Sequence, residues 1–428
     1  MQEQESILDS PESVSADLLD NDRYLEAAAS FGDKRSLVAA QPIYSTHGIK
    51  LLDTGARIDT RILGRLFGHK LAEPLDRCVA SEDAIRPRDI AARARELVAE
   101  VPLLAYLEAG LGAGSARLWS AWERCPLPPA IAIRLTVARD TATDLYEHSL
   151  RCTFVAAFIG LGGRFSDRDL QLLVTAGLLH DMGMMHADPA QYEGGKALDP
   201  MARRALLAHP LTAQLIAQRE PLLSPAVASA LAEHHERVDG SGYPRGLHGD
   251  AIGKHGRALA LAEVVTGVVD RHPDEACGLL APLLRFNRRS FDGGLCDALL
   301  AALPRTAPGE AVAAAGHAAF DAAVARIDSW KRISDSMQED DQDAATAFID
   351  ARIDRLGRWL ADAGVDDPRA AVLAAQEEPA LQWEIAALAR EAGWHLRQIA
   401  YEVSECWPQP PSSPIGEWIA MIRESTLA

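Results

Sequence analysis

The chain has 428 residues, of which 48% are hydrophobic and 6% aromatic. This length exceeds that of a typical single domain, and a composition rich in alanine and leucine but poor in aromatic residues favours a mainly α-helical protein. The 43 basic and 61 acidic residues leave a formal net charge of −18, which argues against binding to long nucleic acids or to an anionic membrane surface. A small anionic ligand stays compatible with this charge where bound metal ions make the local field positive.

The cysteines and the start of the chain indicate the compartment. The six cysteines are scattered without a CxxC pair, so they suggest neither a disulfide framework nor a zinc finger. The first residues, MQEQESILDSPES, lack the basic start and apolar run of a signal peptide, and no apolar run approaches the ~20 residues of a membrane span. We therefore expect a soluble, cytoplasmic protein.

The N-terminal part divides into a tail and a small unit. Residues 1–22 are acidic and polar and are predicted to be disordered. Residues 23–130 are predicted to form a small α+β unit, with a regulatory role as one reading. Within it, QPIYSTHGIKLLDTGARI alternates apolar and polar residues around Thr46-His47-Gly48, which predicts a hairpin, and helical spacing follows from DTRILGRLFGHK onward.

The remainder of the chain reads as helices. Residues 131–333 contain successive stretches with apolar residues at i, i+3, i+4 and i+7, such as DRDLQLLVTAGLLHDMG and SPAVASALAEHHER, which predict one packed helical domain. An acidic linker is expected at 334–345, and a helical C-terminal extension at 346–428. Five tryptophans of this extension either build a small core of its own or form a surface for a protein partner: Trp359, Trp383, Trp394, Trp407 and Trp418.

Histidines and carboxylates gather in the middle of the chain. Nine of the thirteen histidines fall between 148 and 272. Asp144 and His148 share one helix face because they are four residues apart. The pair His180-Asp181 follows the apolar stretch LLVTAGLL, where unpaired polar side chains would be costly to bury. The candidate metal ligands are Asp144, His148, His180, Asp181, His209, His234, His235 and Glu263.

Each of these residues alone has an ordinary structural explanation, such as a satisfied core histidine or a buried hydrogen-bonded pair. Together they exceed the ligands that one zinc ion needs, and a set of imidazoles and carboxylates without thiolates suits iron or manganese in a centre of two or three ions. Asp181, next to His180, is the expected bridging carboxylate. His234 and His235 point about 100° apart if both are helical, so we expect them to reach for different partners.

The string HHERVDGSGYP at 234–244, together with HD at 180–181, resembles the HD-GYP family, a branch of the HD phosphohydrolases. The resemblance extends over roughly residues 131–310. It implies an HD-type helical bundle that degrades the bacterial second messenger cyclic di-GMP, with the eight candidates as metal ligands and with His234 and His235 on different ions. It also implies a substrate-binding set: Asp239, Gly240, Gly242, Tyr243, Pro244, Arg245 and Arg257.

The sequence departs from the family pattern on the substrate side. Met184 stands where the family has a lysine expected to contact a substrate phosphate, and a charge-assisted contact of that kind is worth about 1.5–3 kcal/mol. Glu263 replaces an aspartate ligand, and EVVTG lacks the second aspartate of the family's DxxDA. The cations that could replace the lysine are Arg237, Arg245, Lys254 and Arg257.

Two functions remain open at this stage. The first is metal-dependent hydrolysis of cyclic di-GMP to pGpG or GMP by a metal-bridging hydroxide, with His180 and Asp181 as catalytic residues. The second is a weak or inactive member that acts as a cyclic di-GMP sensor or as a protein-interaction module through the C-terminal helices. Hydrolysis of another phosphate ester is a third reading, and a homodimer is left open.

Overall fold

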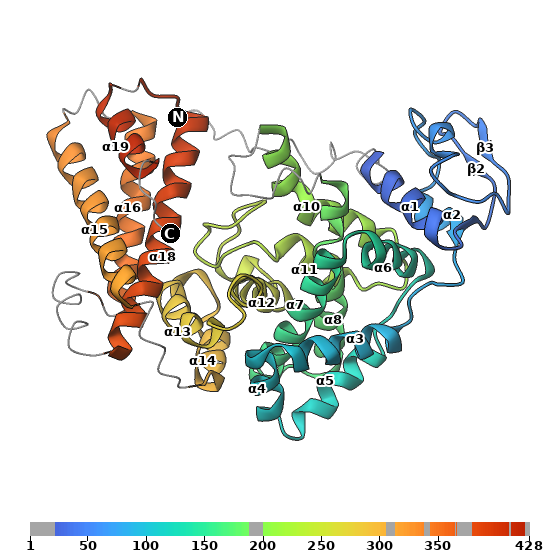
Figure 1. Cartoon of the computed structure of the whole chain (residues 1–428), viewed down its shortest axis with the longest axis horizontal. Helices are drawn as coiled ribbons and strands as arrows, with labels where there is room; N and C mark the ends of the chain where they lie inside the picture. Colours follow the sequence, from blue (N-terminus) through green and yellow to red (C-terminus); the bar gives the residue numbers. More distant parts are fainter. Residues whose placement is uncertain are drawn as a thin grey trace. The chain divides into compact units, whose positions relative to one another are not determined.

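The computed structural model describes residues 22–187, 200–304, 313–337, 343–363, 365, 379–410 and 412–423. Two compact units divide the chain: the first unit comprises Met1–Arg271 and Ser290–Ala302, and the second unit comprises His272–Arg289 and Leu303–Ala428. The described residues are mainly helical (Figure 1), as predicted. The predicted disordered tail, apart from its last residue, lies outside the described residues.

The first unit begins with the predicted small α+β region. Its two strand pairs are both antiparallel, β1 with β4 and β2 with β3. The β2–β3 pair turns over Thr46-His47-Gly48, which confirms the predicted hairpin. The elements of this region are α1 (Asp22–Lys34), β1 (Val38–Ala39), β2 (Ile43–Tyr44), β3 (Lys50–Leu52), η3 (Leu63–Arg65), α2 (Leu75–Cys78) and β4 (Val79–Ala80).

A helical bundle follows in the same unit. Helix α7 packs against α8 and α12, while α11 packs against α8, α10 and α12, and Figure 1 shows these helices gathered around one centre. The elements are α3 (Pro87–Glu100), α4 (Pro102–Gly110), α5 (Gly114–Glu123), α6 (Pro129–Thr141), α7 (Thr143–Gly162), α8 (Asp167–Leu179), η4 (Met182–His186), α10 (Pro200–Gln218), α11 (Pro225–Glu233), η6 (Gly249–Ala251), α12 (Lys254–Arg271), η7 (Arg288–Ser290, whose last residue is in this unit) and α14 (Gly293–Ala302).

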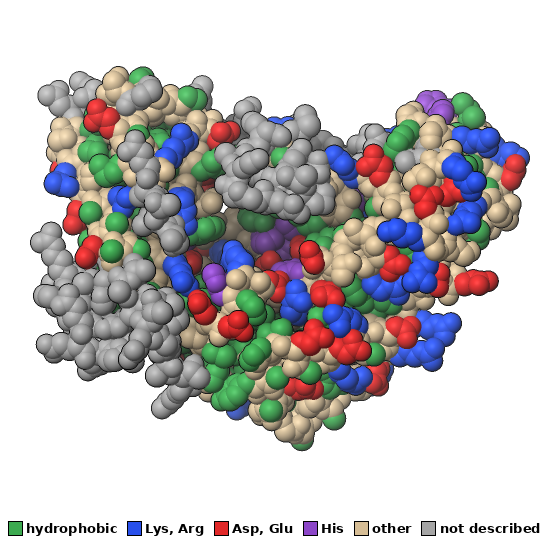
Figure 2. Space-filling model, in the orientation of Figure 1, with side chains coloured by type: hydrophobic (Ala, Val, Ile, Leu, Met, Phe, Trp, Pro, Cys, Tyr) green, Lys and Arg blue, Asp and Glu red, His purple; other side chains and the backbone are tan. Residues whose placement is uncertain are grey.

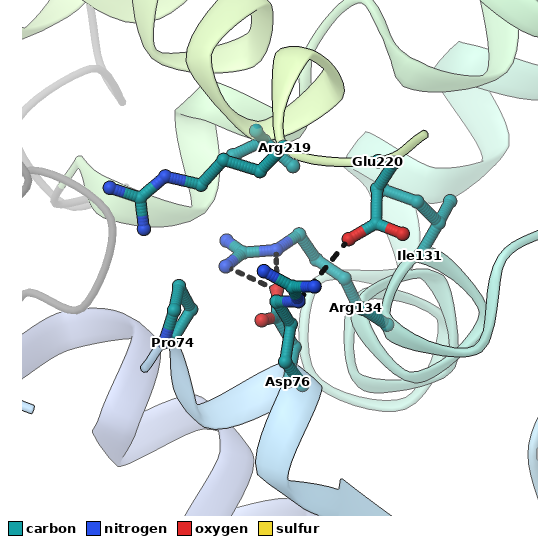
Figure 3. A pocket seen from close by; sticks show the side chains of 9 residues that line it. Pro74, Asp76, Ile131, Arg134, Arg219 and Glu220 are labelled. Carbon is teal, nitrogen blue, oxygen red and sulfur yellow. Dashed lines mark hydrogen bonds and ion pairs between the residues drawn. The ribbon is translucent and has the colours of Figure 1, made fainter. Parts of the chain in front are cut away.

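A buried ion pair joins α2 to α6 in the first unit. Arg134 and Asp76 are 1% and 5% exposed, and the Arg134 Nε donates to Asp76 Oδ2 at 2.7 Å. Arg134 also contacts the His186 ring of η4 at 2.9 Å and lies over the Tyr24 ring. Figure 3 shows the charged side chains around this pair, with Glu220 beside them. The pair therefore fixes α1, α2 and η4 on α6.

The second unit is a separate group of helices with an apolar core. Its helices are α13 (Ala276–Phe286), α15 (Ala313–Ser336), α16 (Ala344–Asp362), α18 (Pro379–Cys406) and α19 (Pro414–Arg423). Trp330, Trp359 and Trp418 are buried in this core, and Trp407 packs against it. Trp394 is 45% exposed, and the side chain of Trp383 lies outside the described residues. Most of the described tryptophan rings of the extension thus serve its core.

The division into units differs from the predicted domain boundaries. The boundary expected at residue 333 falls inside α15, because Phe320, Ile327 and Trp330 of this helix pack into the core shared with α18. The expected linker begins within the same helix, and residues 338–342 lie outside the described part. Asp343 caps α16 by accepting a hydrogen bond from Thr346 N at 2.8 Å. None of the described helices is long and apolar enough to cross a membrane.

Candidate metal centre

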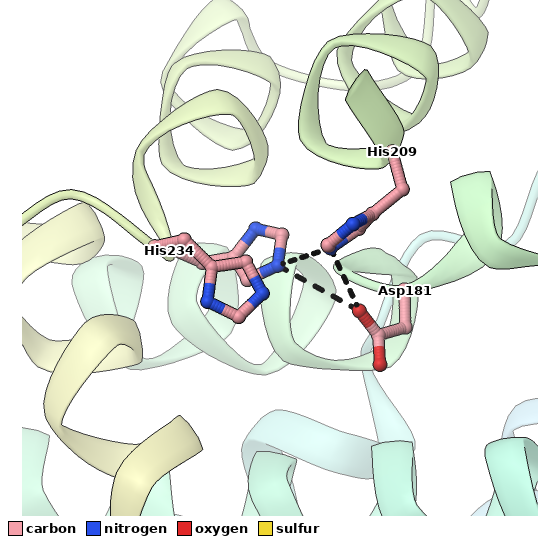
Figure 4. Close-up of side chains that lie close together, drawn as sticks. Asp181, His209 and His234 are labelled. Atoms are coloured by element: carbon pink, nitrogen blue, oxygen red, sulfur yellow. Dashed lines mark hydrogen bonds and ion pairs between the residues drawn. The ribbon is translucent and has the colours of Figure 1, made fainter. Parts of the chain in front are cut away.

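Seven of the predicted ligands form two neighbouring groups inside the first unit. The first group contains Asp181, His209, His234 and His235, and the second contains His148, His180 and Glu263. In each group the potential ligand atoms lie within 4.8 Å of one another. Figure 4 shows Asp181, His209 and His234 pointing toward a common point. Figure 2 shows histidine side chains among acidic and basic ones near the middle of one face.

Three of the histidines are oriented by carbonyl groups of their own helices. The Nδ1 atoms of His180 and His234 lie 2.7 and 2.6 Å from the carbonyl oxygens of Gly177 and Leu231, three residues earlier. A carbonyl oxygen only accepts, so each Nδ1 carries the proton and donates. In a neutral ring Nε2 is then unprotonated and directed at the centre, which is the usual arrangement of a metal-binding histidine.

His209 obtains the same orientation from the proline that follows it. Pro210 has no N–H, so the carbonyl group of Leu206, four residues earlier in α10, lacks its normal helical partner. The Nδ1 of His209 donates to this free carbonyl oxygen instead. The local sequence His-Pro therefore both frees an acceptor inside the helix and uses it to fix the imidazole.

A close approach of two backbones brings Asp181 beneath His209. Asp181 precedes η4, which packs against α10. A Cβ atom at Gly183 would lie only 2.1 Å from the carbonyl oxygen of His209, so no larger residue fits there without a backbone shift. The glycine two residues after Asp181 thus keeps this carboxylate at the centre.

The carboxylate of Asp181 lies between the two groups. Its Oδ1 is 3.3 Å from His209 Nε2 and 3.6 Å from His234 Nε2. Its Oδ2 is 3.4 Å from His180 Nε2 and 3.8 Å from His148 Nε2. Each oxygen therefore faces a different group, as a carboxylate does when it bridges two cations.

The positions of the Nε2 atoms indicate whether cations fit this centre. The Nε2 atoms of His209 and His234 lie 3.0 Å apart, and with both Nδ1 atoms donating elsewhere two lone pairs face each other. The buried Nε2 of His180 has no hydrogen-bond partner of acceptable geometry. Both arrangements are unfavourable unless a proton or a cation lies at the centre. The donor set of imidazole nitrogens and carboxylate oxygens therefore fits divalent metal ions.

The electrostatics of the two groups agree with a site that binds cations. Burial lowers the pKa of His180, but the carboxylates of Asp181 and Glu263 outweigh it and raise this pKa to about 10. Burial and the neighbouring His180 and His209 lower the pKa of His234 to about 4. The carboxyl groups of Asp181 and Glu263 have lowered pKa values because the facing imidazoles outweigh their burial. The carboxylates of Asp181 and Glu263 are therefore anionic at neutral pH, as metal ligands must be.

His234 and His235 lie in one group of potential ligands; that they bind different ions, as the resemblance implies, stays a prediction. The divergence of about 100° between neighbouring helical residues assumed a continuous helix, but α11 ends at Glu233 and His234 is its cap. The chain then turns, and the two rings lie 4.2 Å apart. Their separation along a regular helix therefore does not apply here.

The loop after His235 folds back over this histidine. The Tyr243 ring stacks on the His235 ring at 4.6 Å with an interplanar angle of 16°. A Cβ atom at Gly242 would lie 2.4 Å from the carbonyl oxygen of His235, so this position requires glycine. The Tyr243-Pro244 peptide bond is cis. Residues 242–244 of the predicted substrate-binding set thus lie beside the first group.

Two acidic side chains hold the loop in place. Glu236 is 1% exposed and accepts backbone hydrogen bonds from Arg245 N at 2.8 Å and Leu247 N at 2.9 Å. Asp239 accepts from Ser241 and, through its other oxygen, from Ser290 at 3.0 Å. Gly240 N closes the turn on the Arg237 carbonyl oxygen. Asp239 therefore serves the loop itself in this structure.

The predicted replacement cations are engaged with acidic or aromatic groups. Arg257 lies 3.3 Å from Asp292 and 3.4 Å from Asp250, and Lys254 lies 2.8 Å from Asp169. The other two predicted replacements also have neighbours: the Arg245 guanidinium lies 3.8 Å from the carboxylate of Glu233, and the Arg237 guanidinium lies over the Phe291 ring.

Two residues singled out in the sequence do not join the metal groups. Asp144 is exposed at the start of α7 and belongs to neither group among the described residues. Met184, at the family's lysine position, is half-buried in η4.

Three residues were not identified from the sequence, although they contact the predicted ligands directly or through another residue: Asp270, Arg151 and Cys152. Asp270 Oδ2 lies 2.6 Å from His148 Nδ1, and Arg151 Nε donates to the other oxygen of Asp270 at 2.6 Å. The Cys152 thiol donates to Glu263 Oε2 at 3.7 Å. Arg151 and Cys152 lie one turn from His148, and Asp270 lies two turns from Glu263, so helical spacing was the available signal.

Comparison with known proteins assigns this region. Residues 136–279 match the HD domain family. The HHERVDGSGYP string lies in the same region, and curated relatives are named cyclic di-GMP phosphodiesterases, so this region is similar to HD-GYP proteins.

The individual relatives overlap only part of this chain. A 3'3'-cGAMP-specific phosphodiesterase 3 of Vibrio cholerae is 32% identical over 130 residues, 30% of this chain and 28% of the relative. The cyclic di-GMP phosphodiesterase response regulator RpfG of Xanthomonas campestris is 30% identical over 168 residues, 38% of this chain and 44% of the relative. A probable cyclic di-GMP phosphodiesterase of Vibrio cholerae is 38% identical, with 39% of this chain and 37% of the relative covered. The chain thus spans less than half of these relatives.

A solved structure aligns with this chain at a low TM-score. Bd1817, an HDG"Y"P protein from Bdellovibrio bacteriovorus, aligns with a TM-score of 0.35 and 14% identity, covering 62% of this chain and 94% of that one. A TM-score of this size supports no statement about the fold of this chain.

Proposed function

We propose that this protein is a metal-dependent phosphohydrolase that cleaves a phosphodiester bond of cyclic di-GMP, giving pGpG or GMP. The observation that carries the proposal is the convergence of seven ligand atoms on two neighbouring positions, with Asp181 between them. The buried Nε2 of His180 supports it as well, because it faces carboxylate oxygens of Asp181 at 3.4 Å and Glu263 at 3.2 Å. Iron or manganese suits this set of nitrogen and oxygen ligands.

The chemistry of such a centre is that of paired Lewis acids. Two divalent ions, when bound, lower the pKa of a coordinated water and neutralise charge that develops on phosphoryl oxygens. The residues of this chain supply the geometry. His209, His234 and His235 hold one position, His148, His180 and Glu263 hold the other, and Asp181 spans both.

The loop residues are proposed to position the substrate. Tyr243 stacks on His235, and Glu236 fixes the backbone of Arg245 and Leu247, so the loop is held next to the first group before any ligand arrives. His148 and Glu263 are 17% and 16% exposed, whereas His180 and His234 are fully buried. The more accessible side of the centre is therefore proposed as the approach for a phosphodiester.

The names of the relatives support cyclic dinucleotides as the substrate class. Some are named for cyclic di-GMP and others for 3'3'-cGAMP. The test is hydrolysis of both compounds by the purified chain loaded with manganese or iron, compared with the His180→Ala variant. We expect turnover of cyclic di-GMP by the wild-type chain alone. Absence of turnover of cyclic di-GMP at two bound metals per chain contradicts the proposal.

A second candidate function is nucleotide sensing with little or no turnover. The observation that favours it is that two of the described candidates for replacing the family lysine, Arg257 and Lys254, are paired with aspartates. Calorimetry with cyclic di-GMP distinguishes the candidates, because a sensor binds the nucleotide tightly without cleaving it.

Restoring the lysine tests which part of the site limits activity. Met184→Lys is expected to raise kcat/KM about tenfold to a hundredfold, since it adds one charge-assisted phosphate contact. Met184→Leu serves as the control of similar shape and no charge. An unchanged kcat/KM in both variants would show that the missing lysine does not limit activity.

A further inference from the structure

The histidines of the centre are anchored in two different ways. His180, His209 and His234 donate Nδ1–H to main-chain carbonyl oxygens of their own helices. His148 instead contacts the side-chain carboxylate of Asp270, which belongs to another helix. An anchor of this kind carries a full negative charge and can be removed by mutation without touching the backbone.

We propose that Asp270, held by Arg151, is the positioning residue that sets metal affinity at the position formed by His148, His180 and Glu263. The inference rests on the proposed metal centre and names a residue outside its ligands. Asp270 acts through the His148 ring and is not itself a ligand.

The geometry places His148 between two carboxylates of α12. Its Nε2 lies 3.1 Å from Glu263 Oε2, and its Nδ1 lies 2.6 Å from Asp270 Oδ2. Glu263 and Asp270 are seven residues apart and therefore lie on one face of the helix, two turns from each other. One carboxylate thus faces the metal side of the ring, and the other holds its opposite nitrogen.

Arg151 holds the carboxylate of Asp270, which in turn orients the ring of His148. Its Nε donates to Asp270 Oδ1 at 2.6 Å, and it also lies 3.8 Å from Glu147. Arg151 is three residues after His148 on α7, so both contacts of Asp270 go to the same helix face. Arg151 and Asp270 are 16% and 23% exposed, which leaves this pair only partly screened by solvent.

The chemical consequence is confined to one metal position. A carboxylate that accepts Nδ1–H fixes the tautomer of the ring and makes Nε2 a stronger donor to a metal, and loss of such partners costs about tenfold to a hundredfold in metal affinity. In the group of Asp181, His209, His234 and His235, the imidazoles of His209 and His234 are anchored by main-chain carbonyl oxygens instead of Asp270. We therefore expect the two positions to respond differently to substitution of Asp270.

Stepwise manganese titration by calorimetry tests this inference on the full chain. The variants are Asp270→Ala, Asp270→Asn, which keeps an acceptor oxygen but loses the charge, and His148→Ala, which marks the phase that belongs to this position. Asp167→Ala is the matched control, because it removes another Asp–Arg pair, with Arg117 at 2.8 Å, away from the metal groups. Thermal unfolding of each variant verifies the fold.

The expected result is selective. Asp270→Ala weakens the phase lost in His148→Ala about tenfold to a hundredfold, Asp270→Asn weakens it less, and the other phase and the control remain as in the wild type. Wild-type affinity at both positions in Asp270→Ala, or equal weakening of both, overturns the inference while the proposed function stands. Fewer than two ions bound by the wild type overturns the proposed function and the inference with it.

Discussion

The two compact units of this chain bury very different side chains. The second unit encloses an apolar core of helices α13, α15, α16, α18 and α19. Two of its buried tryptophans, Trp330 and Trp418, donate their N–H groups to Asp350 and to the Arg326 carbonyl oxygen. The first unit has an apolar framework too, but its centre holds the carboxylate of Asp181 and fully buried imidazoles of His180 and His234.

This difference indicates where function resides. Burying a polar group without a partner costs about 1–3 kcal/mol, so a folded protein rarely keeps several of them together without a ligand. The first unit buries polar side chains that a divalent cation would pair with. The contrast between this polar centre and the apolar core of the second unit can be tested by substitution.

The largest effect is expected at the carboxylate between the two metal groups. Asp181→Asn removes the charge that faces both groups and should lower the hydrolysis rate by roughly a thousandfold or more while weakening both metal positions. Steady-state kinetics with elemental analysis measures both quantities. A variant that keeps two ions and near-normal turnover would remove Asp181 from its bridging role.

A buried charge pair away from the metal groups gives the next effect. The loss of unfolding free energy caused by its mutation should be the same with and without manganese. Arg134→Met leaves Asp76 buried without its partner, which is expected to cost about 3–5 kcal/mol of unfolding free energy. Arg139→Met is the control, since its pair with Asp140 is partly exposed and worth at most about 1 kcal/mol. Denaturant unfolding with and without manganese provides the values, and a stable Arg134→Met protein would contradict them.

A cavity in the apolar core of the second unit should lower stability without changing the metal content. Leu396 is fully buried there, so Leu396→Ala is expected to cost about 2–5 kcal/mol of unfolding free energy. Metal content should stay as in the wild type, because no described residue of the second unit belongs to the metal groups. The exposed Glu405→Ala on the same helix is the control. Loss of metal in the Leu396 variant alone would link the two units functionally.

Acidity should act on the metal groups in a defined direction. Without metal the pKa of His180 is raised to about 10, so this imidazole holds a proton at neutral pH that an ion must displace. Metal affinity should therefore fall as the pH is lowered, by about tenfold per pH unit for each displaced proton. Manganese titrations at several pH values between 6 and 8 measure the slope. An affinity independent of pH would contradict a protonated His180 in the metal-free protein.

The smallest effect is expected at Asp144, where sequence and structure disagree. The sequence predicts a ligand four residues before His148, but the side chain is exposed and outside both groups. Asp144→Asn should therefore leave metal stoichiometry and turnover within about twofold of the wild type. Loss of one ion in this variant would favour the sequence-based prediction of a third metal position.

The ligands could be predicted where local sequence determines their direction. His209 precedes a proline that frees a helical carbonyl group, and His180-Asp181 ends a buried helix and is followed by the glycine that lets η4 approach α10. These features are local, so a sequence contains them. The helical class and the small hairpin followed from apolar spacing in the same way.

Other features depend on contacts between distant segments. Asp270 could not be assigned, because its role depends on which nitrogen of His148 it meets across two helices. The end of α11 at Glu233, which sets the directions of His234 and His235, was not visible in the apolar pattern. The boundary near residue 333 was misplaced because an amphipathic helix such as α15 shows the same spacing whichever core it joins.

Anomalous diffraction from crystals of the chain soaked in manganese tests the central claim most directly. The account predicts two anomalous peaks on either side of the Asp181 carboxylate, one contacted by the Nε2 atoms of His209 and His234 and the other by those of His148 and His180. A single peak, or imidazoles that turn away from both positions while manganese is bound elsewhere, would contradict it.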